Sequence, residues 1–380
     1  MMKYYFIYSA GGGAGDWNGI KRVWEEDMPE RLKNNILLKF GDIYFNHKSS
    51  TNILRRERWN NITNIRNWLY ENVNDEYVLN NSNIILDSGT AKIVNFIDHN
   101  YNLGELDTDQ IIEYFINIID SNHIIEKYAD IIVESKINLA VCFDIPDPFK
   151  VRSDNAIVER RRNILEKDKE IELMDVSILY TNKLYNILKE RINEEQTVEI
   201  LMPVVNGQWN KEQFNRFLSK LEFFPKNIAI GGISGRDYKI NDLQLNEFGL
   251  DKFKRVHFLG CGGLSKTKDF KKFFDGDKYS VDVSTPINRA IDGATSGNSF
   301  SGIYSYNDFE LYRINDQTRN VIINDYKNWN GDKIFSLEKF TSIIDGILKH
   351  QSGNSDEETY DNRARLIILN SDVFRHNAEL

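Results

Sequence analysis

The sequence has only two cysteines, its histidines are scattered, and it has no long apolar run. Its two cysteines, Cys142 and Cys261, each lie in or beside an apolar stretch; this fits a reducing compartment and cannot supply a cysteine-rich zinc site. The six histidines show no metal-ligand spacing, so we expect no metal and no cofactor. No apolar stretch reaches the roughly 18–20 residues that span a bilayer, and the short start Met1–Tyr8 predicts a first strand rather than a signal peptide. We therefore expect a cytoplasmic protein without a membrane partner.

The chain also lacks an excess of basic residues. Its net charge of -9 argues against a generally basic nucleic-acid binder, although it leaves room for local basic patches. Its 380 residues, 41% of them hydrophobic, are enough for a sizeable core in one large domain or two ordinary ones.

Short apolar runs alternate with segments of helical periodicity. The runs lie at 3–9, 35–40, 83–89, 137–145, 197–205, 227–233, 255–261 and 279–284, and the helical segments at 53–72, 108–132, 155–193, 211–221 and 335–350. Eight buried strands alternating with helices predict a (β/α)8 TIM barrel. We expect a barrel domain with insertions over residues 1–300 and a short C-terminal extension, 301–380, packing on it. The alternative is a doubly wound open sheet, but Gly11–Gly15 does not match its dinucleotide fingerprint and predicts a loop.

Three of the apolar runs end in or near an aspartate. These are Asp87, Asp144 and Asp282, and removing the partner of a buried charge costs on the order of 3–5 kcal/mol. Carboxylates at the ends of parallel strands gather at the face of a barrel where chemistry occurs. With no Cys or His nucleophile among them, they suit glycosyl transfer through an oxocarbenium-like transition state. Asp87 as a helix cap, and Asp144 shaping a turn with Asp147, are the alternatives.

Six strand-end motifs occur in an order that resembles the tRNA-guanine transglycosylase superfamily, over roughly residues 80–290. They are Asp87-Ser88-Gly89-Thr90, Phe143-Asp144-Ile145-Pro146, Val205-Asn206-Gly207, Ala229-Ile230-Gly231-Gly232-Ile233, Phe258-Leu259-Gly260, and Asp282 followed by Pro286 and Arg289.

The resemblance implies a role for each position. Asp282 is the expected nucleophile toward C1′ of a guanosine, and Asp87 handles protons on the departing and arriving bases. Asp144 accepts from the N1–H and amino edge of the purine, and Asn206 donates to its carbonyl side. The other expected substrate contacts are Ser88, Gly207, Gly231, Gly232, Leu259 and Gly260, and the expected phosphate contacts are Arg289, Lys266 and Lys268.

The chain departs from the family pattern in ways that favour one branch. Ala91 replaces a base-stacking aromatic residue, Asn206 replaces glutamine, residues 233–237 differ from the family run, and the C-terminal zinc site is absent. These differences favour the branch that exchanges guanine in DNA for a free 7-deazaguanine such as preQ0, with partner proteins an open question. The alternatives are a tRNA enzyme of the queuosine or archaeosine type, a barrel glycosidase or nucleosidase, and a non-catalytic nucleic-acid-binding subunit.

Overall fold

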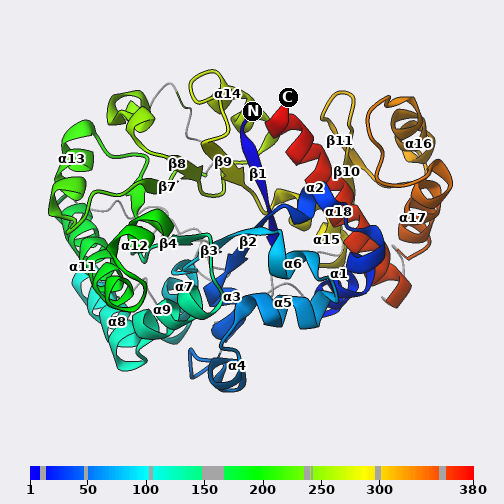
Figure 1. Cartoon of the computed structure of the whole chain (residues 1–380). Coiled ribbons are helices and arrows are strands. Elements are labelled where there is room, and N and C mark those ends of the chain that lie inside the picture. Colours follow the sequence, from blue (N-terminus) through cyan, green and yellow to red (C-terminus); the bar gives the residue numbers. More distant parts are fainter. Residues whose placement is uncertain are drawn as a thin grey trace. The chain divides into compact units, whose positions relative to one another are not determined.

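The chain folds as an α/β protein of the (β/α)8-barrel class, which confirms the predicted fold class (Figure 1). The computed structural model describes residues 1–8, 14–46, 50–101, 106–147, 167–234, 240, 243–295, 301–350 and 357–380. Nine strands follow one another in the sheet in the order β5-β4-β3-β2-β1-β9-β8-β7-β6, and a separate two-stranded sheet pairs β10 with β11. Within the described residues no helix has the length and apolar character to cross a membrane.

Each predicted apolar run contains a strand. The strands are β1 (Lys3–Tyr8), β2 (Asn35–Lys39), β3 (Asn83–Asp87), β4 (Leu139–Val141), β5 (Leu201–Met202), β6 (Val204–Asn206), β7 (Asn227–Gly231), β8 (Arg255–Phe258), β9 (Tyr279–Asp282), β10 (Gly302–Tyr304) and β11 (Leu311–Arg313). Eight runs yield nine strands because Pro203, which has no N–H, divides the fifth run into β5 and β6. The first part of that run is helical instead, since Asn193 caps the preceding helix by accepting from the Gln196 N–H.

The predicted helical segments are also divided. The helices are α1 (Ala14–Asp27), α2 (Glu30–Lys33), α3 (Phe40–Tyr44), α4 (Arg56–Asn61), α5 (Ile65–Val73), α6 (Tyr77–Asn80), α7 (Ala91–Tyr101), α8 (Thr108–Ser121), α9 (Ile124–Glu134), α11 (Lys167–Ile192), α12 (Glu194–Ile200), α13 (Lys211–Lys220), α14 (Leu264–Lys271), α15 (Thr285–Thr295), α16 (Arg319–Asn328), α17 (Leu337–His350) and α18 (Glu357–Glu379). The segment 108–132 breaks between α8 and α9, where His123 has a left-handed φ of 52°. Of the predicted glycine loop, Gly11–Gly13 lies outside the described residues and Gly15 falls within α1.

The chain divides into two compact units. Unit 1 consists of Met1–Ile36, Arg66–Ser82 and Gly260–Leu380, and unit 2 of Leu37–Ile65 and Asn83–Leu259. Both ends of the chain therefore belong to unit 1, whereas the predicted division at residue 300 stays a prediction.

Unit 1 is organised around the C-terminal helix α18, which contacts α1, α15 and β1. Its Asp372 is fully buried and accepts hydrogen bonds from Arg31 at 2.7 Å, Arg375 at 3.0 Å and the Tyr306 hydroxyl at 3.0 Å. A buried carboxylate is tolerated when it is paired in this way. This network holds α18 to α2 and to the residues after β10.

Unit 2 contains β3 to β8, in which β3 pairs with β4, β4 with β5, β6 with β7 and β7 with β8, all in parallel. The Tyr128 ring packs edge-to-face against Phe40 and Phe143. Its centroid lies 5.1 Å from that of each ring. The Tyr128 hydroxyl lies 2.8 Å from the carbonyl oxygens of both Leu86 and Val141. Helix α9 thereby fixes the carboxyl ends of β3 and β4 against each other.

Candidate functional site

Asp87 is the last residue of β3, and Asp144 lies just beyond the carboxyl end of the neighbouring strand β4, which ends at Val141. Leu86 of β3 pairs with Ala140 of β4, so Asp87 ends its strand level with Val141, shortly before Asp144. The Thr90 hydroxyl donates to the Asp144 carboxylate at 3.0 Å. The Asp87 carboxylate accepts from the Gly89 N–H at 3.2 Å, which makes a local Asx turn.

The two carboxylates interact electrostatically. The pKa of Asp144 is raised to about 6, first by burial of its carboxyl and then by the negative charge of Asp87, whereas the hydrogen bond from Thr90 opposes the rise. Asp144 as a residue is partly exposed, but its carboxyl group is surrounded by protein. A carboxylate with this pKa is ionised near neutral pH and becomes a neutral donor in mild acid.

The turn between the strand and α7 is built from close backbone packing. Gly89 has a φ of +70°, and a Cβ there would lie 2.7 Å from the Gly41 nitrogen of α3. Ser88, between Asp87 and Gly89, is fully buried, and its hydroxyl has no hydrogen-bond partner among the residues that the structure describes. Since a buried unpaired hydroxyl costs free energy, this group suits a ligand that supplies the missing partner.

Replacing Gly89 by alanine is expected to lower the free energy of unfolding by about 3 kcal/mol, because left-handed strain adds to the collision with Gly41. Gly249 is the matched control. It has a φ of +61°, but the nearest atom to its Cβ would be 3.7 Å away, so Gly249→Ala is expected to cost about 1 kcal/mol. Urea unfolding of both variants measures the difference. Equal losses would show that the approach of Gly41 is unimportant.

A second group of predicted residues gathers at the carboxyl ends of β6, β7 and β8. Asn206 pairs with Gly231 in the sheet. The side-chain amide oxygen of Asn206 accepts from the Gln208 backbone N–H at 3.0 Å, and the Gly207 N–H donates to the Gly231 carbonyl at 2.9 Å. With its side-chain oxygen engaged, Asn206 has its amide N–H groups left to donate. Its donor role toward a base stays a prediction.

Gly232 supports this group by having no side chain. Its φ is +76°, and a Cβ there would lie 2.4 Å from the Asn206 side-chain oxygen. The Gln208 side chain donates to the Gly232 carbonyl at 2.6 Å. Leu259 is alongside, since a Cβ on Gly231 would lie 3.7 Å from its Cδ1. The structure therefore brings together the predicted residues of strands β6, β7 and β8.

Asp282, in unit 1, is the last residue of β9 and is 4% exposed. Its carboxylate accepts from the Gly260 N–H at 2.8 Å, and its carbonyl accepts from the Gly262 N–H at 2.8 Å. Gly260 has a φ of +67°, a conformation that glycine adopts without strain. The structure thus joins two predicted site residues, Asp282 and Gly260, in one hydrogen bond.

The predicted phosphate contacts differ in their surroundings. Lys266 is half-buried on α14, and its charge and that of Asp282 both act on the buried thiol of Cys261, whose pKa is raised to about 12 chiefly by burial. Lys268 is exposed on α14, and Arg289 is half-buried on α15. Both cysteines are free and buried, as expected of core residues. A further basic segment, with Lys150, Arg152 and 160–162, lies outside the described residues.

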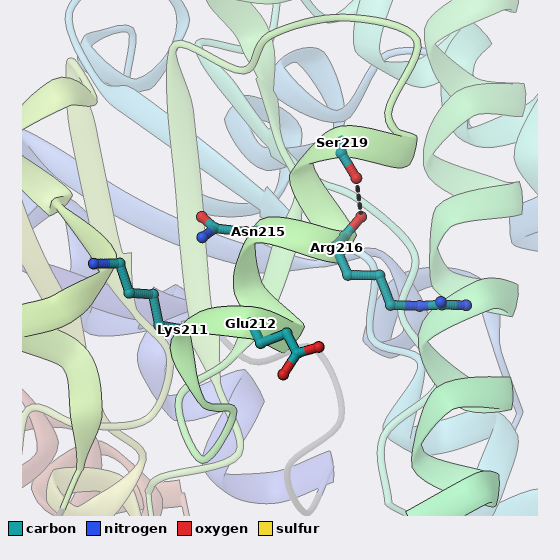
Figure 2. Close-up of a pocket in the computed structure, with 5 residues that line it drawn as sticks. All are labelled: Lys211, Glu212, Asn215, Arg216 and Ser219. Carbon is teal, nitrogen blue, oxygen red and sulfur yellow. Dashed lines mark hydrogen bonds between the residues drawn. The ribbon is translucent and has the colours of Figure 1, made fainter.

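An open surface hollow of about 630 Å³ lies on α13. Figure 2 shows its lining residues, which are Lys211, Glu212, Asn215, Arg216 and Ser219. Arg216 extends toward α11, where its guanidinium bonds Asp175 at 3.2 Å, and its carbonyl accepts from the Ser219 hydroxyl at 2.8 Å. None of the predicted site residues is among these lining residues, and the mixed charges give the hollow no preference for an anion.

Thr90 and Gln208 take part in these arrangements but were not predicted. Thr90 lies 54 residues from Asp144 in the sequence, so no local pattern signals their contact. Gln208 follows the motif Val205-Asn206-Gly207, and its amide character was the available signal. Ala91, at the start of α7, is exposed and offers no ring for stacking.

Comparison with known proteins adds no family to this description. No protein-family model matches the chain, and a search of the curated proteins finds no match.

Proposed function

We propose that the chain is a guanine transglycosylase that exchanges guanine in a polynucleotide for a free 7-deazaguanine such as preQ0. The polynucleotide proposed is DNA rather than tRNA. The proposal rests on the six strand-end motifs and on one structural observation in unit 2. That observation is the pair Asp87 and Asp144, which lie at the ends of adjacent parallel strands and interact through their charges.

The proposed reaction is a double displacement. The Asp282 carboxylate attacks C1′, the C1′–N9 bond breaks, and guanine leaves with the bonding pair and a proton that Asp87 supplies. The incoming base then gives its N9 proton to Asp87 and attacks C1′. The bond between C1′ and the Asp282 oxygen breaks and the carboxylate is regenerated, as in retaining glycosyl transfer.

Base recognition is assigned to the groups that have spare hydrogen-bonding capacity. Ionised Asp144 accepts from the donor edge that guanine and 7-deazaguanines share, and the Asn206 amide donates to their carbonyl. A site with such charged acceptors discriminates strongly against bases that lack the donors. The target nucleotide leaves the helical stack or comes from a single-stranded stretch.

The test is incorporation of radiolabelled guanine and of unlabelled preQ0 by the purified protein, with duplex DNA and with tRNA as separate acceptors. Label in DNA, with preQ0 nucleoside found by mass spectrometry of the digested DNA, is the expected result. Label in tRNA alone would move the activity to the tRNA branch. Release of guanine without an incoming base would indicate a nucleosidase, and no label with no covalent adduct on a denaturing gel would overturn the proposal.

A further inference from the structure

A compact group of basic and aromatic side chains lies on and beside the short helix α4 of unit 2. We call it the α4 patch, and its members are Arg55, Arg56, Arg58, Trp59 and Lys127. Helix α4 has six residues and none of them is buried. Figure 1 shows α4 below α3, at the lower edge of the view. Arg56 and Glu57 are exposed, so core packing does not account for these two residues.

The helix is held in place from below rather than by its own length. A six-residue helix is unstable alone, and here the Tyr44 carbonyl accepts from the Arg55 N–H at 2.8 Å while the Tyr44 hydroxyl donates to the Ile62 carbonyl at 3.1 Å. The Trp59 ring packs edge-on against Phe40 and Tyr44 at 6.2 and 6.0 Å. The side chains of the α4 patch are thus displayed on a rigid base.

Two close approaches occur within the patch, that of Arg55 to Arg58 and that of Lys127 to Trp59. The half-buried Lys127 ammonium lies 5.7 Å from the Tyr44 ring centroid and 5.8 Å from that of Trp59, a cation–π arrangement, and it donates to the Ile62 carbonyl at 3.2 Å. The segment Arg55–Asn61 carries three arginines and a single acid, Glu57. Burial and the charge of Arg58 lower the pKa of Arg55, although Asp42 opposes the effect. Asp130 on α9, near Lys127, forms an ion pair with Arg191.

The patch is joined to the turn that carries Asp87. It stands on α3, and α3 meets that turn through the close backbone approach of Gly41 and Gly89. The Lys92 ammonium of α7 also pairs with Asp42 of α3 at 2.8 Å. The α4 patch and Asp87 are therefore linked through α3 within unit 2, on the side of the strands' carboxyl ends, since α3 directly follows β2.

We propose that the α4 patch binds the sugar-phosphate backbone of the polynucleotide whose base is exchanged, with Arg56 as an exposed phosphate contact. The identity of the polynucleotide rests on the proposed function. Three guanidinium groups carried by one short segment, beside an aromatic ring, match a chain of phosphates. Such contacts position the strand without reading its sequence. The acidic net charge of the protein makes a local basic surface necessary for this purpose.

The experiment measures binding, not exchange. Fluorescence anisotropy of a fluorescein-labelled DNA duplex is recorded over a salt series, with a labelled tRNA transcript in a parallel arm. Arg56→Glu is expected to raise the Kd about tenfold near 100 mM salt and to lower the salt slope by about 1, whereas Arg56→Gln raises the Kd about threefold. Lys211→Glu, an equal charge change at an exposed residue of the hollow on α13, is expected to change the Kd by less than about twofold.

The outcomes separate this inference from the proposed function. If Arg56→Glu binds DNA and tRNA as tightly as the wild type, the α4 patch is not the binding surface, and the proposed exchange reaction is unaffected. Arg56-dependent binding without base exchange supports the surface and counts against the enzyme. If Arg56→Glu raises the Kd for a labelled polyglutamate peptide as much as the Kd for DNA, the assignment to a nucleic-acid backbone is wrong. The assignment is also wrong if Lys211→Glu raises the Kd for DNA as much as Arg56→Glu does.

Discussion

Asp282→Asn is expected to lower the rate of guanine exchange by about 10³-fold or more, because an amide cannot form the covalent bond to C1′ that the proposed mechanism requires. The wild-type protein should form an adduct with its polynucleotide that survives a denaturing gel, and the variant should form none. The substitution preserves shape, and an amide oxygen still accepts from the Gly260 N–H that lies 2.8 Å from the carboxylate. The fold is therefore expected to survive.

Asp277→Asn provides the control for this prediction. Asp277 precedes β9 and is exposed, so the same chemical change there should leave exchange and adduct formation at wild-type levels. Thermal unfolding of both variants checks that each is folded. Exchange by Asp282→Asn at the wild-type rate would remove Asp282 from the role of nucleophile, even if other variants affected activity.

Asp144→Asn is expected to raise the stability of the protein and lower its activity. The pKa of Asp144 is raised to about 6, mainly by burial and by Asp87. The folded state thus favours the protonated carboxyl. The stability that this preference contributes is fully present below about pH 4 and is lost as pH rises through 6. Near pH 8 the free energy of unfolding of the variant should therefore exceed that of the wild type by about 1–2 kcal/mol, after allowance for the partial exposure of Asp144. Near pH 4 the two proteins should be alike.

The activity of Asp144→Asn should fall by about 10²-fold in kcat/KM for the incoming base, since the ionised acceptor is lost. For the wild type, exchange should weaken as pH falls through about 6, because protonated Asp144 no longer accepts from both donors of the base. Thr90→Val removes the hydrogen bond that favours the ionised form and should move this midpoint to higher pH. Urea unfolding and exchange kinetics over a pH series test both effects. A variant as active as the wild type would exclude Asp144 from base recognition.

Much of the sheet follows from local sequence pattern. The apolar runs at 35–40, 83–89 and 227–233 became β2, β3 and β7 with little change of bounds, because a strand buried on both faces needs a continuous apolar run. The pattern failed at 197–205, where apolar residues alone do not distinguish a short helix from a strand. There Asn193 and Pro203 decided the outcome, through a cap and a missing N–H.

The sequence by itself determined the parallel α/β class and the approximate place of each strand of the main sheet, since both depend on local periodicity and on polar residues that stop an apolar run. The tertiary structure decided which of those residues meet. It set Thr90 against Asp144, Gly41 against Gly89, and Trp59 of α4 beside Lys127. These contacts join positions far apart in the chain, and they depend on strand register and helix packing, which no single segment encodes.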